Sequence, residues 1–329
     1  MKAKIIVCLM LTGFVWGLPI LAVAQMERPT VRYAEEDVIK QKNYDRKTVY
    51  ECGDRKPIRV AGFVTNPPFG WMDIISGNTL NQDRYVNDGF GYQLFLKMAN
   101  EMNLKVEGVG FKSYYEAVNA LKTGQIDVLL GAYYDKRVLG VGTSVLFPGY
   151  FSNPVVVVFL KGNERPVNSY EDLKGLKGLI RQEEGLYSLI YQGLPKDVQI
   201  EQVSGARKAY TMLLEGKADY MISSLYAIEA EIRRFKITDK VSITTKPLLS
   251  PELFFVFGSN SECLVLKPMF AEKLTQEKQN QGNINQILFK QVDKWIERFR
   301  YAPPLAVEIS SGIGQNAPRE VVEDLRFEN

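Results

Sequence analysis

Few residues of this chain have the types and spacing that chemical catalysis requires. Its 329 residues include no histidine, which excludes Ser-His-Asp and Cys-His catalysis and zinc sites that need imidazole. The sequence contains neither a Walker phosphate-binding loop nor the glycine fingerprint of dinucleotide-binding proteins. Its three cysteines are too few for a Cys-rich metal site. We therefore expect a protein without metal, cofactor or enzymatic activity, whose function is binding.

The N-terminal segment has the features of a secretory signal peptide. Lys2 and Lys4 precede an apolar run over 5–16, and Ala22-Val23-Ala24 is a small-x-small cleavage signal. We expect residues 1–24 to be removed on export. The alternative is a retained membrane anchor, but the apolar run is short for a membrane span. Loss of the two lysines changes the net charge from +3 to +1, which gives no electrostatic case for nucleic-acid binding.

Export would leave Cys52 and Cys263 as the remaining cysteines, in a compartment that permits disulfide bonds. A single pair has one possible connectivity. We expect a structural Cys52–Cys263 disulfide, and two buried free thiols are the alternative.

One stretch of the chain occurs twice. Residues 116–130 return as residues 208–222, and each copy predicts a helix with one apolar face, a glycine, and an apolar strand that begins at an aspartate. The two glycines, Gly124 and Gly216, are 92 residues apart. Two copies of one unit predict two similar α/β lobes, and a cleft between lobes is where ligands are usually held.

The remaining pattern supports a mostly parallel sheet with helices on its faces. Ser113 and Glu116 form a capping box at the start of the first repeated helix. The apolar, β-branched run 154–160 is typical of a strand buried on both faces. Expected elements also include strands at 58–63, 105–109, 178–180, 198–203, 241–244 and 253–257, and helices at 92–102, 184–192 and 284–299.

Several short motifs occur in an order that resembles one protein family. They are Ile58-Arg59-Val60-Ala61, Pro67-Pro68-Phe69, Gly89-Phe90, residues 124–128, residues 171–178, residues 216–219 and Lys294-Trp295. Over about residues 57–297 the chain resembles the bacterial periplasmic solute-binding proteins of family 3, the polar amino-acid-binding type.

The resemblance implies an α/β fold of two Rossmann-like lobes joined by two crossover strands, the type II periplasmic binding protein architecture. Lobe 1 would comprise 57–150 and 252–300, and lobe 2 would comprise 151–251, with hinge closure around a ligand. Residues 25–56 would form an N-terminal extension and 301–329 a C-terminal tail.

The resemblance also implies ligand-binding residues in the first lobe. Phe69 and Trp71 follow the first strand, at the end of the sheet where open α/β folds bind ligands, and the family places a stacking aromatic at the Phe69 position. Phe69 in the core and Trp71 in a loop are the alternatives. Tyr114 opens the first repeated helix, where the family often has an aromatic.

Tyr133, Tyr134 and Arg137 follow the first repeated strand. The family has an arginine here that holds a ligand carboxylate with its two-pronged guanidinium. Arg137 matches, although the spacing is shorter and Tyr134 stands where threonine is usual. A surface arginine is the alternative.

The second lobe departs further from the family pattern. Arg181 and Glu183 stand where amino-acid binders have small hydroxyl residues or glycine, and Glu184 complements the helix dipole. Ser223, Ser224 and Tyr226 could hydrogen-bond a polar ligand. The family's aspartate near Ser224 is missing, which puts a standard amino acid in doubt.

We expect a monomeric periplasmic protein that binds a small polar solute and delivers it to an inner-membrane transporter or presents it to a membrane sensor. The unusual ligand residues and the terminal extensions favour the sensor. One alternative is a closed-cleft scaffold that binds another protein. The less favoured alternative is an enzyme resembling cyclohexadienyl dehydratase, which would use Glu183 with Arg137 or Arg181.

Overall fold

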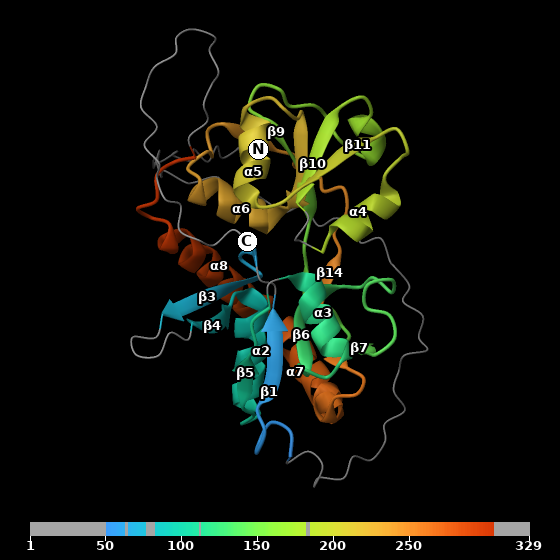
Figure 1. Ribbon diagram of the computed structural model, residues 1–329, viewed down its shortest axis with the longest axis vertical. Helices are drawn as coiled ribbons and strands as arrows, with labels where there is room; N and C mark the ends of the chain where they lie inside the picture. The colour runs from blue at the N-terminus through green and yellow to red at the C-terminus, as the bar shows by residue number, and fades with distance from the viewer. Residues whose placement is uncertain (1–50, 63–64, 77–82, 112, 182–184, 306–329) are drawn as a thin grey trace, which may run out of the picture. The chain divides into compact units, whose positions relative to one another are not determined.

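The computed structural model describes residues 51–62, 65–76, 83–111, 113–181 and 185–305 (Figure 1). The predicted signal peptide, most of the predicted N-terminal extension, Glu183 and residues 306–329 lie outside the described residues. No described helix is long and apolar enough to span a lipid bilayer.

The first lobe is built on a six-stranded sheet with the order β5-β1-β6-β14-β7, to which β8 adds by pairing with β14. Strand β1 runs parallel to β5 and β6, whereas β14 is antiparallel to β6. Its strands are β1 (Ile58–Gly62), β5 (Val106–Gly108), β6 (Val128–Tyr133), β7 (Thr143–Val145), β8 (Phe151–Ser152) and β14 (Glu252–Gly258). The helices of this part of the chain are α2 (Phe90–Glu101), α3 (Tyr114–Lys122), η4 (Glu262–Leu266), α7 (Lys267–Gln279) and α8 (Gln281–Arg298).

The second lobe is built on a five-stranded sheet with the order β11-β10-β12-β9-β13. Its strands are β9 (Val155–Leu160), β10 (Lys177–Arg181), β11 (Gln199–Val203), β12 (Tyr220–Ser224) and β13 (Val241–Ile243). Its helices are η2 (Tyr170–Leu173), α4 (Tyr187–Gly193), α5 (Ala206–Leu214) and α6 (Leu225–Arg234). A separate antiparallel sheet is formed by β2 (Thr65–Asn66), β3 (Gly70–Ser76) and β4 (Asp83–Asp88).

The first four strands in the order of each large sheet have the same relative directions. In each, a central strand is parallel to both of its neighbours, and the fourth strand in the order returns antiparallel to the third. The chain leaves the first sheet after β8 and returns to it at β14, so two segments, ahead of β9 and of β14, connect the sheets. The predicted α/β fold of two Rossmann-like lobes joined by two crossings is confirmed.

The aspartates of the repeated motif have the same structural role in both sheets. Asp127 Oδ2 accepts a hydrogen bond from the backbone N–H of Arg59 at 2.8 Å, and Asp219 Oδ2 accepts one from Lys177 at 2.7 Å. Each aspartate thereby fixes the start of the neighbouring parallel strand. The strands themselves begin one residue later, at Val128 and Tyr220, than the sequence predicts. The repeated aspartates therefore have a structural role in the fold.

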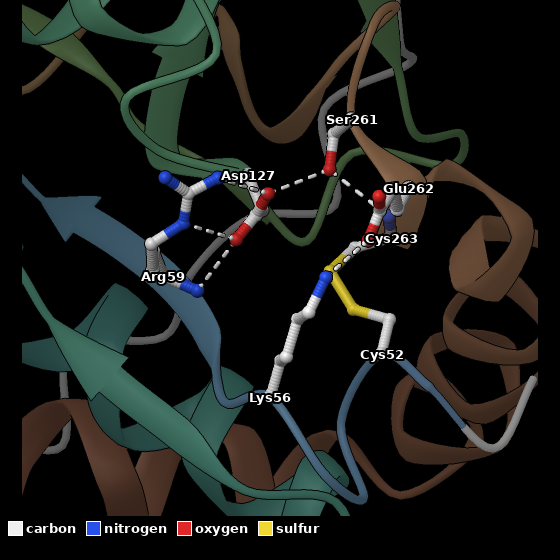
Figure 2. The surroundings of a disulfide bond; sticks show 7 residues. All are labelled: Cys52, Lys56, Arg59, Asp127, Ser261, Glu262 and Cys263. Atoms are coloured by element: carbon white, nitrogen blue, oxygen red, sulfur yellow. Dashed lines mark hydrogen bonds and ion pairs between the residues drawn. A yellow bond between two sulfur atoms is a disulfide. The ribbon is translucent and has the colours of Figure 1, made fainter.

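The predicted disulfide between Cys52 and Cys263 is present, with a Cα–Cα distance of 5.4 Å. Near the disulfide, the Asp127 carboxylate accepts hydrogen bonds from the guanidinium of Arg59 and from the hydroxyl of Ser261 (Figure 2). The bond from Ser261 is 2.7 Å long. The sequence assigns residues 51–56 to the N-terminal extension. In the structure they contact this lobe, where the N–H of Lys105 donates a hydrogen bond to Gly53 O at 2.7 Å.

Helix α8 and the residues after it contact both lobes. The ring of Trp295 lies 5.3 Å from that of Trp71, between centroids, while Arg234 of α6 lies 3.9 Å over the ring of Phe299. Leu305 is buried in the core of the second lobe, and its N–H donates to Phe235 O at 3.0 Å. The described part of the predicted tail, 301–305, is thus held against α6.

Candidate functional site

The turn that carries Phe69 is fixed by the start of α2. Phe90 and Gly91 donate their backbone N–H groups to Pro68 O and Phe69 O at 2.8 and 3.1 Å. Gly89 has φ +110°, and a Cβ there would come within 2.5 Å of the Gly70 backbone. Glycine is therefore required for the helix to approach the turn this closely.

Phe69 makes ring contacts with residues of both lobes. Its centroid lies 6.1 Å from that of Phe151 and 6.2 Å from that of Tyr226, which stands in the first turn of α6. Phe151 and Tyr226 also contact each other, at 5.3 Å. The aromatic residue predicted to stack on a ligand thus lies where the two lobes meet, and it is buried.

The first crossing brings further polar groups to this point. Asn153 Nδ2 donates a hydrogen bond to the Tyr133 hydroxyl at 2.7 Å, so the end of β6 contacts the crossing. Two residues later, Val155 pairs with Ser224 at the end of β12, and Leu225 N–H donates to Pro154 O at 2.8 Å. Residues from the carboxyl ends of β6 and β12 are thereby gathered beside Phe151.

Three buried side chains here have polar atoms with no hydrogen-bond partner among the described residues. They are both amide atoms of Asn66, Oδ1 of Asn153 and Oγ of Ser224. Asn66 belongs to the Phe69 turn, because Phe69 N–H donates to its carbonyl at 2.9 Å. Burying an unpaired polar group costs about 1–3 kcal/mol, so these atoms are candidates for hydrogen bonds to a bound polar molecule. We call Asn66, Phe69, Phe151, Asn153, Ser224 and Tyr226 the junction cluster.

The predicted carboxylate-binding Arg137 is already bound to a carboxylate of this chain. Its Nε and Nη2 lie 3.2 and 3.1 Å from the two oxygens of Asp135, and Nη2 also lies 2.7 Å from Ser188 Oγ in α4. The Ser188 hydroxyl donates to Asp135 as well. The bonds with Asp135 raise the pKa of Arg137. Burial acts to raise the pKa of Asp135, but the bonds from Arg137 and Ser188 outweigh it and lower that pKa overall.

Arg181, at the end of β10, is also neutralised inside the protein. Its guanidinium pairs with Glu231 of α6, and the two side chains are 4% and 1% exposed. Burial raises the pKa of the Tyr133 hydroxyl well above its usual value, and the Asn153 hydrogen bond and the charge of Arg181 act in the opposite direction.

The remaining predicted site residues are placed differently. Trp71 packs on Trp295 of α8, and Tyr134 packs on Phe147 and Phe254 within the first lobe. Tyr114 is buried at the start of α3, near Gly185 of the second lobe. Ser223 is buried in β12. Phe69, Tyr133, Ser224 and Tyr226 are thus brought together, whereas Trp71 and Tyr134 are held by other contacts.

Sequence reasoning missed Asn66, Phe151, Asn153 and Asp135. Asn66 precedes the Pro67-Pro68-Phe69 motif, and Asn153 precedes the apolar run that forms β9, so both stand beside recognised signals. In the part of the chain that the structure describes, no group of Cys, Asp and Glu side chains could hold a metal ion.

The architecture defines a class of fold, that of the type II periplasmic binding proteins. No known family model and no curated protein matches the chain. Among solved structures, the amino-acid ABC transporter substrate-binding protein AbpA from Streptococcus pneumoniae, bound to L-arginine, is similar at 13% identity with a TM-score of 0.57. The similarity covers 73% of this chain and 96% of AbpA.

Two further structures have other roles. A histidine kinase sensor domain with similarity to periplasmic binding proteins is 20% identical with a TM-score of 0.55, over 71% of this chain and 95% of the domain. The ancestral amino-acid-binding protein AncCDT-1, a precursor of cyclohexadienyl dehydratase, is 20% identical with a TM-score of 0.53, over 77% of this chain and 99% of its own. Similarity at this level of identity establishes the fold that these proteins share with this chain.

Proposed function

We propose that this protein is exported to the periplasm and binds a small polar solute between its two lobes, without catalysis. It would deliver the solute to an inner-membrane transporter or present its occupied state to a membrane sensor. The observation that carries the proposal is the set of unpaired polar atoms of Asn66, Asn153 and Ser224, each of which lies within three residues of one of the contacting rings of Phe69, Phe151 and Tyr226. Several solved structures of this fold contain a bound amino acid, which supports a small solute.

The proposal includes a division of the chain. Residues 1–24 would be the signal peptide, 57–150 with 252–300 the first lobe, and 151–251 the second. The similarity to a sensor domain supports the sensor role as much as AbpA supports transport. The junction cluster would be the point where the solute touches both lobes and favours their closure.

A second candidate is the scaffold that binds a protein partner. It is favoured by the Arg137–Ser188 bond, which ties the lobes to each other through the chain's own side chains. A protein that is held closed in this way would need no solute to present one fixed surface. The scaffold predicts that no small molecule stabilises the protein.

Thermal unfolding of the mature protein tests the proposal. The protein is unfolded and refolded to remove bound solute, and is then heated with amino acids, polyamines, organic acids, nucleosides or sugars. A ligand present at 100 times its dissociation constant stabilises the folded state by about 2.7 kcal/mol. Stabilisation by one class supports binding, whereas no shift with any class supports the scaffold.

A variant pair shows where the solute binds. Asn66→Leu removes two unpaired buried polar atoms, so we expect it to fold with at least wild-type stability and to lose stabilisation by the solute. The matched control is Asn100→Leu, because Asn100 is exposed in α2. Retained solute stabilisation in Asn66→Leu would remove the junction cluster from the site.

A further inference from the structure

We infer that the solute is an uncharged molecule that carries hydroxyl or amide groups. The inference rests on the proposed function and narrows it. Two observations carry it: the two arginines among the predicted ligand-binding residues, Arg137 and Arg181, are paired with carboxylates of this chain, and the unpaired buried groups of the junction cluster are amides and a hydroxyl.

A carboxylate ligand that took the two guanidinium nitrogens facing Asp135, Nε and Nη2 of Arg137, would have to displace Asp135 from them. Asp135 accepts both guanidinium bonds, the Arg137 backbone N–H at 2.9 Å, and the Ser188 hydroxyl. Its side chain is only 7% exposed. A ligand that took over the guanidinium would leave this carboxylate poorly hydrated and without its cation. The cost of an uncompensated buried charge disfavours the exchange.

Arg181 is likewise unfavourable for binding a carboxylate ligand. Glu231 and Arg181 are both almost completely buried, so removal of either charge from the pair would leave the other in a low-dielectric environment. The relation is symmetric: Asp135 and Glu231 are held by arginines and so do not attract a cationic solute. Neither position therefore favours a charged solute, whether anionic or cationic.

The atoms of the junction cluster that have no hydrogen-bond partner among the described residues are neutral. The amide of Asn66 can both donate and accept, Asn153 Oδ1 can accept, and the Ser224 hydroxyl can do either. Phe69 and Tyr226 add aromatic surface, which suits the apolar face of a sugar or nucleoside. Hydroxyl, amide and carbonyl groups of such a solute match the junction cluster without any buried net charge.

Isothermal titration of the refolded mature protein tests the inference. The uncharged probes are D-ribose, D-glucose, myo-inositol, uridine and acetamide, and the charged probes are L-arginine, L-lysine, L-glutamate, succinate and putrescine. We expect binding in the first set and none in the second. Binding of a charged probe alone would overturn the uncharged class and leave the binding function intact. Heat from neither set would contradict both.

Releasing Arg137 tests the cause of the selectivity. Asp135→Asn retains the side-chain shape and removes the carboxylate, so we expect succinate and L-glutamate to bind measurably, at least about tenfold more tightly than the detection limit that bounds the wild-type affinity, which corresponds to about 1.4 kcal/mol. Asp197→Asn makes the same change of charge at an exposed ion pair with Lys174, and should give no gain. Equal affinities in both variants would overturn the role assigned to Asp135, and circular dichroism checks that each is folded.

Discussion

Arg137 Nη2 lies 2.7 Å from Ser188 Oγ and 3.0 Å from the Ser188 carbonyl, although the two residues belong to different lobes. Arg137 follows β6 of the first sheet, and Ser188 is in the first turn of α4 of the second. Because Asp135 accepts from both, the three residues form an interlobe latch made only of this chain's side chains and one carbonyl.

Weakening the latch should favour opening of the lobes. In Ser188→Ala, Asp135 and Arg137 each lose a hydrogen bond across the lobes, so we expect small-angle scattering to show a larger radius of gyration without solute. The exposed Ser204→Ala is the control. Since α8 also contacts both lobes, the increase should be limited. An unchanged radius would show that the bonds of the Ser188 hydroxyl do not hold the lobes together.

The latch should also depend on pH. The pKa of Asp135 is lowered in the folded protein relative to the unfolded chain, where an aspartate has a pKa of about 3.9. Its ionised form therefore stabilises the folded state fully above that value, and the contribution is lost as the pH falls through the lowered pKa. The difference in unfolding free energy between wild type and Asp135→Asn should be constant from pH 7 to 5 and shrink in strong acid. A difference that shrinks near pH 6 would contradict this assignment.

The buried pair of Arg181 and Glu231 predicts an asymmetric effect of mutation. Glu231→Gln leaves the guanidinium buried without its anion, and we expect the unfolding free energy in urea to fall by about 3–5 kcal/mol. The double variant Arg181→Met, Glu231→Leu removes both charges and should be more stable than Glu231→Gln. Equal or greater loss in the double variant would show that the pair contributes net stability.

Reduction of the disulfide should destabilise the first lobe. The bond closes a loop with a sequence separation of 211 residues, for which chain entropy gives an upper figure of about 5 kcal/mol. We expect a lower urea midpoint in dithiothreitol, and the same shift in Cys52→Ala, Cys263→Ala without reductant. The double variant also serves as the control, because dithiothreitol should not change it further. A midpoint insensitive to reduction would contradict the stabilising role.

The fold could be read from the sequence because its signals are local. Gly124 and Gly216 have φ +75° and +69°, as expected where a helix ends at glycine, and Ser113 caps α3 as predicted by accepting from Glu116 N–H. Helices α6 and α7 were missed. Helix α6 begins directly after β12, so no turn residue separates the two elements.

The site could be read only in part, because its chemistry depends on partners that tertiary structure supplies. Arg137 was recognised, but nothing in the sequence shows that its partner is Asp135, two residues earlier, and a serine of the other lobe. Trp71 follows the ligand-binding turn in sequence, yet packing on α8 decides its position. The junction cluster could not be predicted, because it depends on a contact between Phe69 and Tyr226, which are more than 150 residues apart in the sequence.

The most direct test of the central claim is native mass spectrometry of the mature protein purified from the periplasm, before and after unfolding and refolding. We predict one bound solute per chain, which is lost on unfolding. Once released, the solute should prove to be an uncharged polar molecule. A folded protein that carries no solute, and takes up none from a periplasmic extract, would contradict the account.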